Sequence, residues 1–418
     1  MALSVSLRTA NYLRPPVWRC FVKRTPSRGL HEVVIASTVR TPIGSFRSSL
    51  SSLPATQLGS IAIRAAIERA GIDPQEVKEV YMGNVIQAGE GQAPTRQAAL
   101  GAGLPIATPC TTINKVCASG LKSVMLAAQG LMCGHQDVMV AGGMESMSNV
   151  PYIMRREDPP YGRVTLEDLI SFDALTDVYN KFHMGNCAEN TARKFKISRE
   201  EQDTFAVSSY ERSKAAWQSG LLAKEIVPVT IQKKEKPDGL VSEDEEYKRV
   251  DFSKISKLKA VFQKEDGTVT AANASKLNDG AAALVLMTVE AAKRLNITPL
   301  ARIVGFADAA VDPIDFPVAP AHAMPKVLKA CGLKQDDVTM WEINEAFSVV
   351  VLANIKMMGL EPSQVNVNGG AVSLGHPIGM SGARILGHLV NALKSKEYGM
   401  AGICNGGGGA SALLVQKY

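Results

Sequence analysis

The sequence predicts an α/β fold built from two similar halves, and three observations lead to this prediction. Short apolar, β-branched runs alternate with helical patterns of small residues, which is typical of sheets covered by helices on both faces. Two strings, MVAGGMES at 139–146 and ICNGGGGASAL at 403–413, each run from apolar residues into glycines. Ser-Gly pairs stand near the start of two small-residue helices, at 119–120 and 381–382. We therefore interpret the second half as a repeat of the first.

The individual elements follow from hydrophobic periodicity. Strands are expected in the runs at 33–35, 77–85, 138–141, 278–289 and 301–306. Helices are expected where apolar residues recur at helical spacing, at 58–66, 121–133, 199–219 and 383–393. In the first helix, Thr56 is a candidate cap and Gly71 a candidate stop. Gly142 and Gly143 are expected to end the strand that precedes them.

Residues 148–277 differ from both halves, because they contain polar loops and a crowded charged stretch. Ser198 and Glu201 have the spacing of a capping box before the long amphipathic helix. We interpret this region as an inserted loop domain. The predicted domains are a leader at 1–31, an N-terminal half at 32–147 and 278–298, the insertion at 148–277, and a C-terminal half at 299–418.

The net positive charge of the chain is concentrated at its beginning. Residues 1–30 contain six basic and no acidic residues, a composition that predicts a mitochondrial transit peptide and a matrix location. A basic tail of another purpose is the alternative. The rest of the chain carries 40 basic and 40 acidic residues, which argues against a nucleic-acid partner. No run approaches about 18 consecutive apolar residues, so no membrane span is expected.

The seven cysteines are odd in number and lack CxxC or Cys/His metal spacing. Free thiols in a reducing compartment are therefore expected, and most of them should be small buried hydrophobes. Cys117 is an exception, because a strand-like segment precedes it and a helix follows it. The unpaired N–H groups and the dipole at a helix start lower the pKa of a thiol, which favours a nucleophile. Taken alone, Cys117 fits a structural cysteine better.

Three further segments carry candidate chemistry. His376 lies in a glycine- and proline-rich loop, where an imidazole can act as a base or donate to an oxyanion. Cys404 precedes Asn405 and the glycines 406–409, whose N–H groups can form an oxyanion hole. Asn344 follows the apolar run 338–343 and can orient a water or a carbonyl, although a helix cap is an equal alternative.

Five strings in this order, NKVCASG, GGMESMS, NEAF, GGAVSLGHPIGMSGAR and CNGGGGASA, together resemble the pattern of the thiolase superfamily. The resemblance covers residues 32–418. It implies the thiolase fold, in which two βαβαβαββ halves form five layers, α-β-α-β-α, with an inserted loop domain.

The resemblance also implies roles for the candidate residues. Cys117 would carry an acetyl group, and His376 would activate the thiol of Cys117. His376 and a water held by Asn344 would form one oxyanion hole. Cys404 would move the α-proton of the second substrate, and the N–H groups of Cys117 and Gly406 would form the second oxyanion hole. A covalent acyl-cysteine divides a difficult carbon–carbon step into two easier ones.

Within the superfamily, the sequence resembles the mitochondrial acetoacetyl-CoA thiolases. That implies reversible condensation of two acetyl-CoA to acetoacetyl-CoA and CoA, as in ketone-body and isoleucine metabolism, and a homotetramer arranged as a dimer of dimers. Residues 315–317, Asp-Phe-Pro, imply acceptance of 2-methylacetoacetyl-CoA. A thiolase for longer 3-ketoacyl-CoA chains and a catalytically inactive acyl-CoA-binding protein are the alternatives.

Coenzyme A and potassium are the small molecules that this resemblance implies. A cluster of five basic residues between 248 and 259 could hold the phosphates of coenzyme A, or could be an ordinary solvated surface. The residues implied around the coenzyme are Tyr210, Arg249, Val250, Asp251, Lys254, Ser275 and His183. The residues implied around potassium are Tyr210 and, through their carbonyl groups, Ala271, Ala272, Ala274 and Val372. Activity is therefore expected to rise when potassium replaces sodium.

Overall fold

The computed structural model describes residues 29–156, 161–232 and 239–418, and residues 31–418 form one compact unit. The predicted transit peptide, residues 1–31, lies almost wholly outside the described residues, and so does Cys20. Within the described part, no helix is long and apolar enough to cross a membrane.

The N-terminal part of the sheet combines parallel and antiparallel strands. Its order is β1-β12-β5-β3-β4, where β3 is parallel to β4 and β5, and β12 is antiparallel to β5 and β1. The strands are β1 (Val33–Arg40), β3 (Glu79–Gly83), β4 (Cys110–Ile113), β5 (Val138–Ser146) and β12 (Asn278–Thr288), with the short β2 (Gly44–Ser45) paired to β12.

The C-terminal part has the order β14-β15-β16-β13, with β14 and β15 parallel and the other pairs antiparallel. Its strands are β13 (Ala301–Ala310), β14 (Val338–Ile343), β15 (Tyr398–Asn405) and β16 (Gly409–Lys417). Val34 and Ile35 of β1 also pair with Arg302 and Ala301 of β13, so one ten-stranded sheet runs through both parts.

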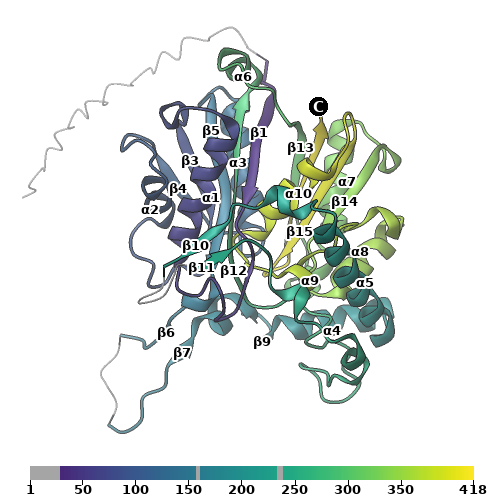
Figure 1. The fold of residues 1–418 in the computed structure, drawn as a ribbon. Helices are drawn as coiled ribbons and strands as arrows, with labels where there is room; N and C mark the ends of the chain where they lie inside the picture. Colours follow the sequence, from purple (N-terminus) through teal and green to yellow (C-terminus); the bar gives the residue numbers. More distant parts are fainter. Residues whose placement is uncertain (1–28, 157–160, 233–238) are drawn as a thin grey trace, which may run out of the picture. The chain divides into compact units, whose positions relative to one another are not determined.

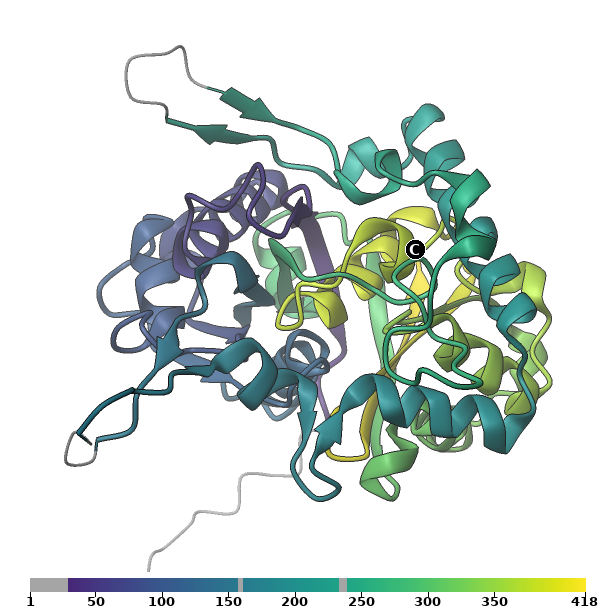
Figure 2. The same cartoon turned by 90° about the horizontal axis from the view of Figure 1, so that it is seen from below.

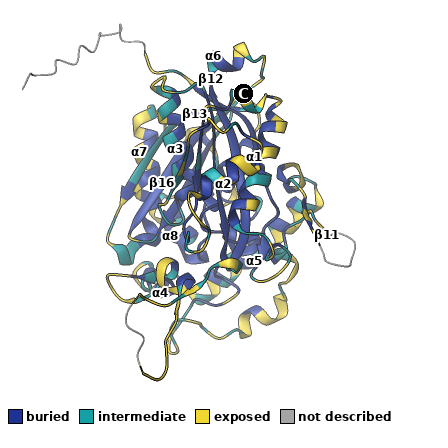
Figure 3. Ribbon diagram, turned by 90° about the vertical axis from the view of Figure 1, so that its left-hand side faces the viewer, coloured by how far each residue is buried: buried dark blue, intermediate teal, exposed yellow. Residues whose placement is uncertain are grey.

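Helices cover the sheet in three layers, as Figure 1 shows. α1 (Ala55–Ala70) and α2 (Pro94–Gly101) pack outside the N-terminal strands. α7 (Pro320–Cys331) and α8 (Ser348–Met358) pack outside the C-terminal strands. α3 (Ser119–Met132) and α10 (Ser381–Ala392) lie between the two parts of the sheet and contact each other. This confirms the five predicted layers, and Figure 3 shows that most strands of the sheet are buried. The C-terminal half departs from the expected βαβαβαββ pattern, because it has four strands and only an isolated bridge between Trp341 and Val365 at the fifth position.

The remaining elements lie mostly in residues 148–277. The helices are α4 (Met184–Phe195), α5 (Arg199–Gln218), α6 (Val289–Arg294) and α9 (Ala371–Leu374). The short strands are β6 (Tyr152–Ile153), β7 (Glu167–Asp168), β8 (Thr176–Asp177), β9 (Phe182–His183), β10 (Val229–Ile231) and β11 (Gly239–Val241). Figure 2 shows β6–β7 and β10–β11 extending away from the central strands.

Local sequence signals were mostly reliable. The capping box of Ser198 and Glu201 begins α5, and Gly71 ends α1 in the left-handed conformation. Thr56 is not the cap of α1, because the helix already begins after Pro54. The expectation that Gly142 and Gly143 end a strand is wrong, since β5 continues through both to residue 146. A Cβ on either glycine would lie 2.0 Å from a carbonyl oxygen, so close packing, rather than a turn, requires them.

Candidate active site

A cavity of about 630 Å³ is lined by some of the chemistry-bearing residues, whereas Cys404 and Asn344 are fully buried and do not line it. Its wall includes residues from both halves of the chain and from the stretch 174–277. Cys117 and His376, far apart in the sequence, both line it, together with bulky side chains such as Met184, Phe316 and Phe347. The predicted convergence of the thiol and the imidazole on one pocket is therefore present in the structure.

A tight turn holds Cys117 at this cavity. Val116, the preceding residue, has a φ of 48°, which a β-branched residue rarely adopts. The N–H of Val116 donates to Asn114 Oδ1 at 2.9 Å. Ser119 Oγ accepts from the N–H of Lys115 at 2.8 Å and donates to Val116 O at 2.6 Å. These three hydrogen bonds stabilise a backbone conformation that costs about 1–3 kcal/mol in isolation.

The environment of the Cys117 sulfur differs from the expectation. Burial raises its pKa to about 11, and the backbone N–H groups of Gly406 and Cys117 itself offset only part of this effect. The prediction of a lowered pKa was wrong for two reasons. α3 begins two residues later, at Ser119, and loss of hydration outweighs the helix start. Cys117 therefore rests as a thiol.

His376 is held by hydrogen bonds on both its backbone and its ring. Its N–H donates to Asn278 Oδ1 at 2.9 Å, and Nδ1 lies 2.6 Å from Ser381 Oγ. Ser381 Oγ donates its own proton to Pro377 O at 2.8 Å, which assigns the ring proton to Nδ1 and the lone pair to Nε2. Burial, together with the charge of Arg384, lowers the pKa of His376 to about 3. The ring is therefore neutral and can accept a proton at Nε2.

Asn344 lies next to Nε2 of this imidazole. It is fully buried after β14, and its Nδ2 is 3.4 Å from His376 Nε2. Its Oδ1 has no hydrogen-bond partner among the described residues. A buried amide oxygen of this kind is available to a water or a substrate. Asn344 is not a helix cap, because α8 begins only at Ser348.

Cys404 and the glycines after it complete the group. Cys404 is fully buried at the end of β15, and burial together with the neighbouring Cys117 raises its pKa well above the usual range. The turn into β16 needs glycine at 407 and 408, where φ is 82° and 85°. A Cβ on Gly408 would also lie 2.2 Å from Val311 O. This turn brings the N–H of Gly406 to the sulfur of Cys117.

The residues expected around coenzyme A are only partly brought together. Arg249, Ser275 and His183 line the cavity. Asp251 and Lys254 are exposed and form an ion pair with each other at 2.9 Å, and Lys248 pairs with Glu243 at 2.6 Å. Val250 packs beside Tyr210 instead of lining the cavity. The basic cluster is thus partly neutralised by its own neighbours.

Three of the five residues expected around potassium surround a lysine instead. Nζ of Lys276 donates to the hydroxyl of Tyr210 at 2.6 Å, to Ala274 O at 2.9 Å and to Val372 O at 3.0 Å. Ala271 lines the cavity, and Ala272 is buried. No group of His, Cys, Asp and Glu side chains within the described ranges is arranged to hold a metal ion.

Ser381, Asn278 and Lys276 are site residues that the sequence did not predict. Ser381 lies five positions after His376 and begins α10, so its local position is the signal that could have indicated it. Asn278 and Lys276 carry no local signal, because their partners lie far away in the chain.

Family models match nearly the whole described chain. The thiolase N-terminal domain matches residues 33–290, and the thiolase C-terminal domain matches residues 297–417. The chain belongs to the thiolase family. Similar curated proteins include the mitochondrial acetyl-CoA acetyltransferase of Danio rerio, 76% identical over 389 residues that cover 93% of each chain. The mitochondrial acetyl-CoA acetyltransferase of Homo sapiens is 74% identical over 388 residues, covering 93% of this thiolase and 91% of that protein.

Solved thiolase structures agree with this one. The Acat5 thiolase from Ascaris suum, in complex with coenzyme A, has a TM-score of 0.89 and 46% identity, and covers 93% of this thiolase and all of that chain. The acetyl-CoA acetyltransferase of Bacillus anthracis has a TM-score of 0.91 and 40% identity, over 94% of this thiolase and all of that chain.

Proposed function

We propose that this thiolase is a mitochondrial acetyl-CoA C-acetyltransferase that interconverts two acetyl-CoA with acetoacetyl-CoA and CoA. The single observation that carries the proposal is that Cys117, His376 and Cys404 share one site, beside the N–H of Gly406. The names of the similar proteins support the same activity and compartment.

In the first half-reaction, the sulfur of Cys117 attacks the thioester carbon of acetyl-CoA while its proton passes to Nε2 of His376. The bond to coenzyme A breaks, and the proton leaves with it as a thiol. Because the pKa of His376 is about 3 and that of Cys117 about 11, the pair rests in the neutral form. Proton transfer therefore accompanies the attack, and the imidazolium is a transient acid.

In the second half-reaction, the thiol of Cys404 gives its proton to the neutral imidazole of His376, and the resulting thiolate takes the α-proton of another acetyl-CoA. The resulting carbanion attacks the acetyl group on Cys117, a carbon–carbon bond forms, and the carbon–sulfur bond breaks. The imidazolium of His376 protonates the departing sulfur of Cys117, so both cysteines are again thiols and the enzyme returns to its starting form. The high pKa of Cys404 makes its thiolate a strong base. The N–H groups of Gly406 and Cys117 would each stabilise the oxyanion by about 3 kcal/mol.

Bulky cavity side chains favour a short acyl chain over the longer 3-ketoacyl alternative. Phe316, Phe347 and Met184 line the same cavity as Cys117, and their bulk supports the proposal of a short acyl chain. Acceptance of 2-methylacetoacetyl-CoA is proposed for the same place, since Phe316 belongs to the Asp-Phe-Pro segment. An inactive acyl-CoA-binding protein is disfavoured, because no catalytic group is missing.

Several finer features are also proposals. We infer that residues 148–277 hold coenzyme A between an N-terminal half, 32–147 with 278–298, and a C-terminal half, 299–418, with Arg249, Ser275 and His183 nearest the coenzyme. The exposed side chains of Tyr152, Met154, Val164 and Leu166 around β6–β7 support a homotetramer. Potassium activation stays a prediction from the resemblance, and the position of Lys276 argues against it.

Intact-mass measurement after incubation with acetyl-CoA tests the proposed roles. The unmodified enzyme and Cys404→Ala should gain one acetyl group, whereas Cys117→Ala should gain none. The unmodified enzyme should form acetoacetyl-CoA, whereas Cys117→Ala and Cys404→Ala should not. Cys133→Ala, at an exposed thiol, is the matched control and should behave like the unmodified enzyme. Normal condensation by both Cys117→Ala and Cys404→Ala would contradict the assignment, and a profile of thiolysis against chain length would decide between short and long substrates.

A further inference from the structure

The ammonium group of Lys276 joins three separate elements beside the cavity. Its three hydrogen bonds reach the Tyr210 hydroxyl on α5, the carbonyl of Ala274 in its own loop, and the carbonyl of Val372 on α9. The ammonium also lies 5.2 Å from the centre of the Tyr210 ring, a favourable arrangement for a cation. The carboxylates of Glu246 and Glu345 supply opposing charge. All three donors of the ammonium are thereby satisfied.

These acceptors are the oxygens that the family resemblance assigns to potassium. A hard monovalent cation would need Tyr210, Ala274 and Val372 as ligands, yet each already accepts a hydrogen bond from Lys276. Two positive charges within a few ångströms of one another in a buried site repel strongly. The residues present therefore do not fit a potassium ion while Lys276 holds this position.

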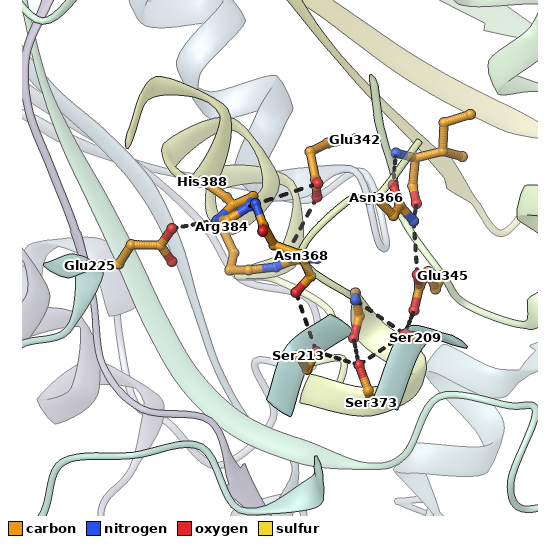
Figure 4. A network of polar contacts seen from close by, with 12 residues as sticks. Ser209, Ser213, Glu225, Glu342, Glu345, Asn366, Asn368, Ser373, Arg384 and His388 are labelled. Carbon is orange, nitrogen blue, oxygen red and sulfur yellow. Dashed lines mark hydrogen bonds and ion pairs between the residues drawn. The ribbon is translucent and has the colours of Figure 1, made fainter. Parts of the chain in front are cut away.

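The elements that Lys276 joins lead directly to the catalytic groups. The N–H of Val372 donates to Glu345 Oε2 at 3.0 Å, and Glu345 follows Asn344 in the chain. Figure 4 shows Glu345 in a buried network that includes Ser209, Ser373 and Asn366.

A second route runs through the loop that contains Lys276. The N–H of Ser275 donates to Ala346 O at 3.0 Å, next to the cavity wall formed by residues 274–277. Glu246 Oε1 accepts from Asn278 Nδ2 at 3.2 Å, and Asn278 Oδ1 holds the backbone of His376. The segments that carry Asn344 and His376 are thus both connected to the ammonium of Lys276.

We propose that Lys276 is a built-in cation, a positioning residue that takes the place of the potassium ion and makes this thiolase independent of monovalent metal ions. Lys276 touches no reacting atom. It holds α5, α9 and the loop 270–277 together, and so fixes the cavity wall and the segment that leads to His376. The kinetic part of this inference rests on the proposed acetyltransferase activity, whereas the binding part does not.

The test compares the unmodified enzyme with Lys276→Thr in potassium, sodium and choline chloride at equal ionic strength. The unmodified enzyme should show equal kcat/KM and equal Tm in all three salts. Lys276→Thr should lose roughly tenfold in kcat/KM in choline chloride, because the buried carboxylates and carbonyls lose their cation. Potassium should restore most of this loss and raise the substrate-free Tm of the variant alone. Lys264→Thr, at an exposed lysine, is the matched control and should match the unmodified enzyme.

The dependence of kcat/KM and Tm on the salt distinguishes a lysine that takes the place of a metal ion from a lysine whose loss only damages the structure. Severalfold activation of the unmodified enzyme by potassium over choline would overturn the proposal, even if Lys276→Thr fails to fold. Equal impairment of the folded variant in every salt, with no potassium-dependent Tm, would also overturn it. The Tm measurements need no substrate, so they remain decisive if the proposed acetyl transfer is wrong.

Discussion

The starts of α3 and α10 carry the same Ser-Gly pair, but the two serines act on different targets. Ser119 hydrogen-bonds to the backbone on both sides of Val116 and thereby shapes the turn that presents Cys117. Ser381 hydrogen-bonds to the ring of His376 and to Pro377 O, and thereby sets a tautomer. One local motif shapes the turn at the proposed nucleophile in one half of the chain and orients the proposed base in the other half.

The glycine strings differ in a similar way. Gly142 and Gly143 stay inside β5, where the missing side chains admit Ala282 O and Gly379 O from neighbouring segments. Gly407 and Gly408 adopt positive φ and form the turn that points an N–H at Cys117. Glycine is needed for space in the first string and mainly for backbone conformation in the second.

The largest expected effect is the loss of stability when alanine replaces a glycine that is needed for close packing. A Cβ at Gly143 would lie 2.0 Å from Gly379 O, so Gly143→Ala should destabilise the protein by about 3 kcal/mol or prevent folding. Gly407→Ala meets no atom within 4 Å and should cost only about 1 kcal/mol, for its positive φ. Urea unfolding midpoints measure both. Equal losses of stability in the two variants would show that close packing does not distinguish the glycines of β5 from those of the turn before β16.

The second effect concerns the charge state of the nucleophile. With pKa values of about 11 for Cys117 and about 3 for His376, the thiolate fraction rises with pH up to about 11. Alkylation of Cys117 by iodoacetamide should therefore accelerate roughly a hundredfold over two pH units above neutrality. Intact mass measures the rate, and Cys117→Ala gives the background. A rate that is independent of pH from about pH 4 upward would indicate a resting ion pair instead.

The smallest effect separates the two serines. Ser381→Ala should lower kcat roughly tenfold, because the imidazole loses its fixed tautomer, and should also lower the free energy of unfolding by about 1 kcal/mol, because two buried hydrogen bonds are lost. Ser119→Ala should lower the free energy of unfolding by about 1 kcal/mol, since two hydrogen bonds of a strained turn are lost. Steady-state kinetics and urea unfolding of both variants provide the comparison. The distinction is wrong if the two variants lose activity and stability in the same proportion.

Much of the candidate site could be predicted from residue type and local setting. Cys117, His376 and Cys404 are predicted from their helix-start or glycine-rich segments, and Asn344 from its place after an apolar run. The structure brings the four residues together. The direction of the pKa of Cys117 could not be predicted, because burial depends on segments such as 174–184 and 261–277 that close the cavity. The lysine among the expected potassium ligands was missed for the same kind of reason.

By itself, the sequence determined the kinds of elements, the capping box of α5, the left-handed end of α1 at Gly71, and the family. These features depend on residues a few positions apart, whose interactions exist in any fold that contains the segment. Only the tertiary structure decided that Gly143 fills a close contact, that the Cys117 thiol rests protonated, and that Lys276 holds Tyr210 and Val372. Each of these depends on burial and on atoms that are brought close by folding, over separations for which the linear order of residues carries no direct signal.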